Sequence, residues 1–209
     1  MENRGTVTLT NSTVSGNSAN IGDGGGIWLS TGNLTVTNST ITGNSATSEG
    51  GGIYDFLSGG TTSLINTIVA SNSAPTAPDC FGSPTFLGNN LIGNNSGCSY
   101  SSGSGDRVGT FSSPKDPLLG ALQDNGGPTL THEILTGSEA IDTGNDSAAP
   151  ATDQRGTSRP QGSASDIGAF ELVTGTSVPG VTGWGLLAIA IVMAAFSARW
   201  FRRRAPQQA

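Results

Sequence analysis

Charged side chains are scarce in this chain, and most of those present are acidic. Only 11% of the 209 residues are charged, with 9 basic and 15 acidic side chains. Residues 1–171 hold all 15 acidic residues and five of the basic ones, a net charge of −10, and the other four basic residues are arginines in the tail. Because phosphate binding needs a basic face, we expect no nucleic-acid partner.

Histidine and cysteine are nearly absent. His132 is the one histidine and lies far in sequence from the two cysteines, so we predict neither a metal site nor a cofactor. Cys80 and Cys98 are 18 residues apart and flank a stretch rich in Gly and Asn. A disulfide closing a loop of that length would stabilise the fold by about 3 kcal/mol. We predict this disulfide, which agrees with export; two unpaired buried thiols are the alternative.

The chain does not open with a secretory signal. Met1 is followed by Glu2, Asn3 and Arg4 and then directly by a repeated segment, with no apolar stretch between them. A solenoid that starts within a repeat leaves its first strand edges uncapped. We therefore expect the chain to be the C-terminal part of a longer protein, or the product of a fragmentary gene model.

What the sequence does contain is an internal repeat. Residues 5–19 and 32–46 are offset by 27 positions and are identical at 10 of 15 aligned positions. A weaker third copy begins 28 residues later. Thr, Val, Leu and Ile dominate the copies and apolar residues alternate with threonine, which indicates short strands. Self-similarity at this period predicts one supersecondary unit stacked on itself.

Stacking the repeats predicts an all-β fold, a parallel β-solenoid whose equivalent strands pair about 4.8 Å apart. One interior column would contain Val7, Leu34 and Leu64, and another Val14, Ile41 and Val69. Side-chain amides would form two ladders, the first of Asn11, Asn38 and Asn66 and the second of Asn17, Asn44 and Asn72. Disorder is the alternative, but a disordered segment has no reason to keep Val, Leu and Ile in register.

The C-terminal tail has the composition of a membrane span. Residues 178–198 carry no charge, and Arg199, Arg202, Arg203 and Arg204 follow. About 20 apolar residues can cross a bilayer, and flanking arginines mark the cytoplasmic side. We predict a transmembrane helix over 181–201, a basic cytoplasmic tail over 202–209, and the body of the protein outside the membrane. A buried core helix is the alternative.

This tail resembles the C-terminal protein-sorting signals of Gram-negative bacteria, the PEP-CTERM and IPTL-CTERM types. The residues that carry the resemblance are Val178, Pro179, Trp184, Gly185, Arg202, Arg203 and Arg204. Gly180 and Val181 stand where these signals usually have Glu-Pro. The resemblance implies a sorting protease as a partner and removal of the tail after export; a permanent single-span anchor is the competing interpretation.

Residues 79–171 are less repetitive and carry distinctive strings: NNLIG at 89–93, DPLLG at 116–120, DNGGPT at 124–129, AIDTG at 140–144 and DIGAFE at 166–171. Together they resemble the choice-of-anchor Q domain of bacterial surface proteins, and the upstream repeats are similar to right-handed parallel β-helix proteins of the pectin-lyase-like class. The resemblance implies coils over 1–78, terminal coils and a cap over 79–172, and a linker with the sorting motif over 173–180. It transfers no activity to particular residues.

Charged residues near the end of this region form a candidate ion cluster of Asp153, Arg155, Arg159, Asp166 and Glu171. Two cations among three acids suit Arg–carboxylate pairs that close the last coil. A ligand site made of the same residues is the alternative. Residues 142–146 could offer oxygens to calcium, but the segment is short of ligands and a plain turn is the preferred interpretation.

No catalytic constellation is visible. Glycoside hydrolysis needs two carboxylates across one bond. Asp23 and Glu49 precede their glycine runs at an offset of 26 and could stack about 5 Å apart, but a solvated turn explains them, and His132 lies outside the repeats. We therefore expect a non-enzymatic, surface-displayed β-helix that contacts carbohydrate, extracellular matrix or other cells. The alternatives are the anchoring part of a polysaccharide lyase or hydrolase, and a structural stalk.

Overall fold

The computed structural model describes residues 1–3, 5–56, 60–101 and 103–173. The chain divides into two units, 1–172 and 173–209. The predicted membrane helix over 181–201, the basic tail over 202–209 and the sorting residues Val178, Pro179, Trp184, Gly185, Arg202, Arg203 and Arg204 lie outside the described residues. Among the described elements there is no helix that could span a membrane.

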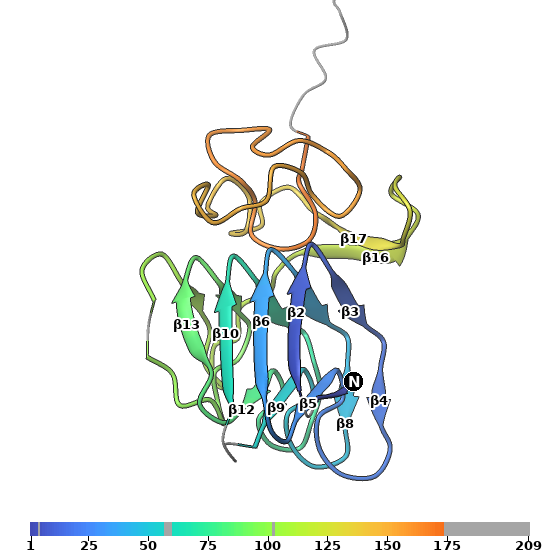
Figure 1. Ribbon diagram of the computed structural model, residues 1–209, viewed down its shortest axis with the longest axis vertical. Coiled ribbons are helices and arrows are strands. Elements are labelled where there is room, and N and C mark those ends of the chain that lie inside the picture. Colours follow the sequence, from blue (N-terminus) through green and yellow to red (C-terminus); the bar gives the residue numbers. More distant parts are fainter. Residues whose placement is uncertain (4, 57–59, 102, 174–209) are drawn as a thin grey trace, which may run out of the picture. The chain divides into compact units, whose positions relative to one another are not determined.

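The repeats form a parallel β-solenoid of about three turns, and the described part of the chain is all-β, as the sequence predicts (Figure 1). Sheet A contains β1 (Glu2–Asn3), β5 (Ile27–Leu29), β9 (Ile53–Asp55) and β12 (Cys80–Phe81). Sheet B contains β2 (Thr6–Thr10), β6 (Asn33–Thr37), β10 (Thr61–Ile65) and β13 (Thr85–Gly88). Sheet C contains β3 (Thr13–Ser15), β7 (Thr40–Thr42), β11 (Ile68–Ala70), β14 (Leu91–Ile92) and β15 (Arg107–Val108).

Two smaller strand pairs complete the fold. The parallel pair of β4 (Ser18–Ala19) and β8 (Ser45–Ala46) extends the first two coils. The antiparallel hairpin of β16 (Leu119–Gln123) and β17 (Thr131–Ile134) belongs to the non-repetitive segment that follows the coils. Strands β12, β13 and β14 continue the three long sheets, so the coil architecture extends past residue 79.

The strand register confirms one of the two predicted interior columns. Val14, Ile41 and Val69 are paired neighbours in sheet C. The prediction that Leu64 stacks on Leu34 is wrong, because Leu64 pairs with Val36 while Thr62 occupies the place opposite Leu34. The third copy is offset by 28 residues, so its apolar residue falls opposite the second aliphatic residue of β6 and not the first.

The disulfide between Cys80 and Cys98 is formed, which confirms that prediction. It joins β12 to the loop after β14. The inner faces of the sheets meet in a core that includes Leu34, Ile41 and Ile53, and Cys80 belongs to this core. The disulfide therefore ties the end of the solenoid to its interior.

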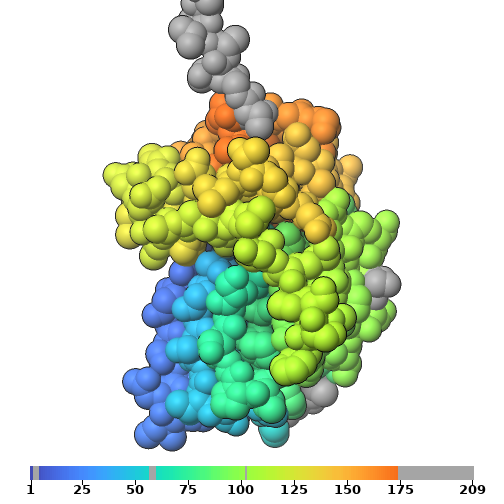
Figure 2. Space-filling view, turned by 180° about the vertical axis from the view of Figure 1, so that it is seen from behind, coloured from blue at the N-terminus to red at the C-terminus, as the bar shows by residue number. Residues whose placement is uncertain are grey.

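Residues 116–172 form a layer, here called the cap layer, that packs against the outer face of sheet C. In Figure 2 the yellow to orange residues of this layer lie above the blue to teal residues of the coils. Ile68, Ala70 and Leu91 on the outside of the sheet pack against a second apolar cluster, which contains Ile134, Ala140, Ile167 and Phe170. The central strands β7, β11 and β14 of sheet C are therefore buried on both faces, which suits a continuous apolar run such as Ile68–Ala70.

The cap layer also contacts the bends that lead from sheet B to sheet C. Asn11, Asn38, Asn66 and Asn89 occupy these bends with φ values of 47°, 43°, 51° and 52°, a conformation that Asn tolerates better than most residues. Asn38 Nδ2 donates to Asp166 O at 3.3 Å, and Gly168 N donates to Asn66 O at 2.8 Å. The cap layer therefore lies along the coils at one corner.

Candidate functional site

The first predicted amide ladder is incomplete. Asn66 Nδ2 donates to Asn38 Oδ1 at 3.0 Å, but Asn11 Nδ2 donates to Thr152 O of the cap layer at 2.6 Å. Asn11 Oδ1 is buried without a hydrogen-bond partner in the part of the chain described. The cap layer thus competes with the neighbouring coil for the amide groups of this row.

The second ladder is continuous and ends on a carboxyl group. Asn17 donates to Asn44, Asn44 to Asn72, and Asn72 to Asp79, each from Nδ2 to Oδ1 at 2.9 Å. The backbone N–H groups of the three asparagines donate to the same oxygen atoms at 3.0 Å. Asp79 therefore takes the position that the next asparagine of the ladder would occupy.

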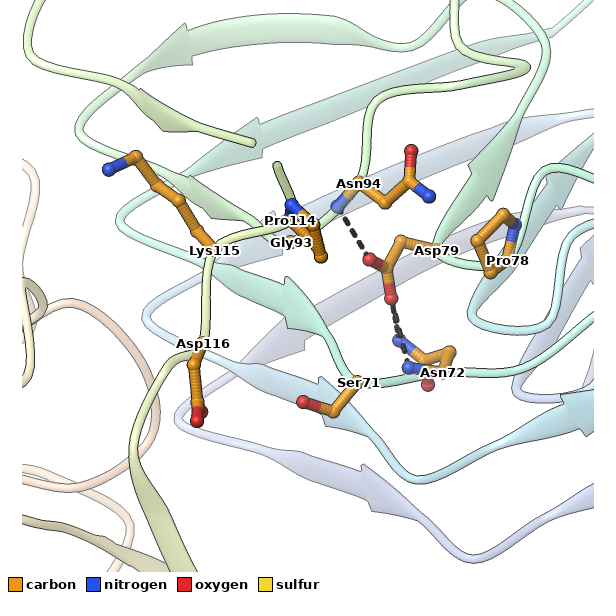
Figure 3. Close-up of a pocket in the computed structure, with 9 residues that line it drawn as sticks. All are labelled: Ser71, Asn72, Pro78, Asp79, Gly93, Asn94, Pro114, Lys115 and Asp116. Atoms are coloured by element: carbon orange, nitrogen blue, oxygen red, sulfur yellow. Dashed lines mark hydrogen bonds between the residues drawn. The ribbon is translucent and has the colours of Figure 1, made fainter. Parts of the chain in front are cut away.

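Asp79 borders a polar pocket of about 330 Å³ (Figure 3). Its Oδ1 atom accepts the two bonds from Asn72, and its Oδ2 atom accepts the N–H of Asn94 at 2.7 Å. The residue is 3% exposed. Burial raises the pKa of Asp79 to about 6, while the bonds from Asn72 and Asn94 act in the opposite direction.

The other walls of this polar pocket come from two further segments. Gly93 lies against Asp79, and a Cβ atom at this position would be 2.6 Å from Asp79 Oδ2, so the absence of a side chain leaves room beside that oxygen. Lys115 and Asp116 approach from the junction that leads into the cap layer, and Lys115 Nζ is 2.6 Å from Glu139 Oε1. The pocket is thus lined by acidic, amide and basic residues, and the Lys115 ammonium group is directed to Glu139.

A second pocket of about 260 Å³ adjoins the first and shares Pro78 with it. This aromatic pocket is lined by Phe81, Phe111 and Glu49, together with small residues of 74–77. Phe111 is 78% exposed. Aromatic walls beside one carboxylate distinguish this pocket from its polar neighbour.

The aromatic pocket is continuous with an aromatic row on the outer face of sheet A. Trp28, Tyr54 and Phe81 are register neighbours on successive coils, and the rings of Tyr54 and Phe81 stack with their centroids 4.8 Å apart. Burial raises the pKa of Tyr54, and the carboxylates of Asp23 and Glu49 raise it further. The phenol therefore remains a hydrogen-bond donor at neutral pH.

Asp23 and Glu49 lie on neighbouring coils beside this row. Asp23 Oδ1 accepts the backbone N–H of Glu49 at 3.1 Å, and Glu49 Oε1 accepts the hydroxyl of Thr76 at 3.1 Å. Each carboxylate thus bonds to the next coil along the solenoid. These hydrogen bonds are typical of structural residues in turns. They do not fit a pair of catalytic carboxylates that face one glycosidic bond.

The predicted ion cluster is assembled within the cap layer. Arg159 Nη1 is 2.7 Å from Glu171 Oε2, and Arg155 Nη2 is 2.7 Å from Asp153 Oδ2. Asp166 accepts the backbone N–H groups of Asp142 and Leu172 at 2.7 and 2.6 Å. Burial raises the pKa of Asp166 to about 6, against the effect of those two donors.

The predicted position of this cluster, closing the last coil, is wrong. Asp166 and the neighbouring Gly168 contact the bends at Asn38 and Asn66, on interior coils of the solenoid. The physical reason is the apolar outer face of sheet C, which draws Ile167 and Phe170 into the second core. None of the cluster residues lines either pocket.

Residues 142–146 form part of a turn in the cap layer. Asp142 N donates to Asp166, and Asp146 Oδ1 accepts the N–H of Ser165 at 2.7 Å. Within the ranges that the structure describes, no group of three or more His, Cys, Asp or Glu side chains could hold a metal ion.

Sequence reasoning missed both pockets. Their walls come from Glu49 and from the segments 71–81, 93–97 and 111–116, which carry no shared motif. The one available signal was Asp79, an acid that follows the last asparagine of a repeat. Comparisons with protein-family models, curated proteins and solved structures gave no match.

Proposed function

We propose that this β-solenoid binds carbohydrate at the two pockets that meet at Pro78. The observation that carries the proposal is their adjacency, an aromatic pocket with Phe81 and Phe111 beside a polar pocket with Asp79 and Asn94. Sugar rings have apolar C–H faces and a rim of hydroxyl groups. Apolar walls with a few placed polar groups are the usual composition of small-ligand sites.

The charges around the pockets favour neutral sugars over uronates. Glu49 lines the aromatic pocket, and Asp79 and Asp116 line the polar one. The nearby cation, Lys115, is paired with Glu139. A polyanion would approach a region whose net charge is −10 over 1–171, and like charges repel over several ångströms.

Binding to a panel of neutral and uronate oligosaccharides, measured by isothermal titration calorimetry, tests this function. We expect binding to neutral oligosaccharides and a loss of about tenfold in affinity for Phe111→Ala, since a sugar would cover the exposed Phe111 ring and such an aromatic contact is worth about 1.4 kcal/mol. Leu87→Ala is the matched control, because Leu87 is also exposed but lines neither pocket. Equal affinities of the native protein and Phe111→Ala would disprove the assignment.

We also propose that the protein is displayed outside the cell and held or sorted through residues 178–209. The support is the uncharged segment 178–198 followed by four arginines, and the resemblance of the preceding region to choice-of-anchor Q domains and of the repeats to right-handed pectin-lyase-like β-helices. A bacterial sorting protease and the membrane are the partners this implies. Deletion of Val178–Ala209 should release the protein into the medium, and continued membrane association of the shortened chain would contradict the anchor.

The proposed contact is non-enzymatic, with adhesion to carbohydrate or extracellular matrix as its role. The alternative is that the chain is the anchoring part of a polysaccharide lyase or hydrolase. In that case, incubation of the protein with uronate polymers should produce unsaturated or reducing ends. If the protein is a structural stalk, we expect it to bind no glycan.

A further inference from the structure

Ser15 and His132 meet at the edge of sheet C, although 117 residues separate them. Ser15 is the last residue of β3 in the first complete coil, and His132 lies in β17 of the cap layer. Figure 1 shows β17 passing beside β3. The Oγ atom of Ser15 is 2.8 Å from the Nε2 atom of His132.

The other ring nitrogen determines the direction of this hydrogen bond. His132 Nδ1 is 2.7 Å from the carbonyl oxygen of Gly120. A carbonyl oxygen can only accept, so Nδ1 carries the proton of the neutral ring and the lone pair of Nε2 accepts the Ser15 hydroxyl. A hydroxyl bonded to a base, with the base oriented by a third group, is the arrangement that activates serine nucleophiles.

The hydroxyl can be approached from one side. Gly16 follows Ser15 with φ +70°, and a Cβ atom there would meet nothing within 4 Å. Gly43 on the next coil presents no side chain either, and a Cβ atom there would be 3.6 Å from Ser15 Oγ. Thr42 and Ala70, which continue the Ser15 column on the next coils, are buried. Ser15 and His132 themselves are partly exposed.

Apolar side chains border the pair. Leu122 lies opposite His132 across the β16–β17 hairpin and is 42% exposed. Directly opposite residues of an antiparallel pair share one face. Leu130, two residues before His132, is 51% exposed. These leucines favour a substrate whose acyl group is apolar.

We propose that Ser15 and His132 form an esterase site for carboxylic esters with an apolar acyl group. Ser15 Oγ attacks the ester carbonyl carbon as its proton passes to His132 Nε2. The carbon–oxygen bond to the alcohol breaks, the alcohol leaves with that proton, and the acyl group stays on Ser15. Water then attacks the acyl carbon with Nε2 as base, which releases the carboxylic acid and restores the hydroxyl. We assign the N–H of Gly16 as the donor to the developing oxyanion, because the residue after the nucleophile commonly supplies it.

A fluorophosphonate probe tests the site directly, since it phosphonylates an activated serine hydroxyl and releases fluoride. The full chain is incubated with the probe, the modified residue is located by peptide mass spectrometry, and hydrolysis of p-nitrophenyl acetate and octanoate is followed in parallel. We expect the adduct on Ser15 and faster hydrolysis of the octanoate. Ser15→Ala and His132→Ala should each lower ester hydrolysis by at least about 100-fold, the usual range for a lost nucleophile or base.

Ser18→Ala is the matched control, because Ser18 is an exposed serine of the same coil that bonds to Asn20 and not to a histidine. His132→Gln keeps a polar side chain in the hairpin, so it separates loss of the base from loss of the fold, and circular dichroism confirms that each variant is folded. The absence of an adduct on Ser15 of the folded native protein, or equal labelling of His132→Gln, overturns the proposal. Neither residue lines the two pockets, so glycan binding by Ser15→Ala remains an independent measurement.

Discussion

At the scale of single residues, Asp79 combines a structural and a chemical role. It receives the last bond of the amide ladder, and it also presents a buried carboxyl group to the polar pocket. An asparagine there would continue the ladder but would place an NH₂ group where Oδ2 accepts the N–H of Asn94. A carboxylate at this position therefore accepts the hydrogen bonds that Asn72 and Asn94 donate.

The raised pKa of Asp79 predicts a pH-dependent stability. Its value of about 6, against an ordinary 3.8, means that the folded state binds the proton more tightly than the unfolded state. The contribution of this group is thus full below about pH 4 and is lost as the pH rises through about 6. The difference corresponds to at most about 3 kcal/mol.

Urea unfolding at pH 4 and pH 7 measures this effect as the difference between native protein and Asp79→Asn. We expect the variant to lose the part of the pH dependence that belongs to Asp79, while the similar contribution of Asp166, whose pKa is also raised to about 6, remains. The same pH dependence in both proteins would show that Asp79 titrates as an ordinary carboxyl group.

Arg159 is the second residue whose removal should be costly. Its guanidinium is 2.7 Å from Glu171, and both side chains are 1% exposed. Arg159→Met leaves the Glu171 carboxylate buried without its cation, which typically costs about 3–5 kcal/mol. The control is Lys115→Met, which breaks the partly exposed Lys115–Glu139 pair and should cost less than about 1 kcal/mol. Equal losses in urea unfolding would contradict burial as the cause.

At the scale of elements, the two asparagine rows show how far a repeat determines contacts. The sequence places equivalent asparagines one coil apart in both rows, yet only the row that ends at Asp79 forms a continuous ladder. The other row lies at the corner that the cap layer covers, and Thr152 takes the amide of Asn11. Periodicity predicts which residues meet between coils, but it contains no information about a segment outside the repeat.

Asn44, in the middle of the continuous ladder, provides the test at this scale. Its side chain accepts from Asn17 and donates to Asn72, and the residue is buried. Asn44→Ala should lower the free energy of unfolding by about 2–4 kcal/mol, because buried groups on two coils lose their partners. Asn20→Ala, at an exposed turn of the first coil, should change it by less than about 0.5 kcal/mol. Similar values for the two variants in thermal or urea unfolding would argue against the ladder as a stabilising element.

At the scale of the whole molecule, attachment of the cap layer depends on close approach at Gly168. Its φ is +104°, and a Cβ atom there would be 2.8 Å from Ile68 Cδ1 and 2.9 Å from Thr40 Oγ1. Gly168→Ala should therefore push the cap layer away from sheet C and lower the free energy of unfolding. Limited proteolysis should then cut within 116–172 before the coils are cut.

Gly156→Ala is the control for this prediction. Gly156 also has a positive φ, +92°, but a Cβ atom there would meet nothing within 4 Å. Both variants carry the backbone strain of alanine in this region, so their difference isolates the steric contact, which we expect to be about 1–3 kcal/mol. If the two variants unfold alike, close packing at Gly168 does not hold the cap layer.

The amino-acid pattern was enough to predict the all-β solenoid, the column of Val14, Ile41 and Val69, and the Cys80–Cys98 disulfide. The contacts between coils join residues one period apart, so alternation and register in the sequence are enough to specify them. Leu64 shows the limit of that rule, since it pairs with Val36, 28 positions earlier, and not with Leu34, 30 positions earlier.

The packing of the non-repetitive segment, by contrast, follows from the folded structure and not from the repeat. It brings Asp79 together with Lys115 and Asp116, and Ser15 together with His132. These contacts arise because the outer face of sheet C is apolar and buries Ile134, Ile167 and Phe170 of the cap layer. The hydrophobic effect that drives this burial is not directional. The spacing of residues in the sequence therefore does not predict which polar groups come into contact when the cap layer packs on the sheet.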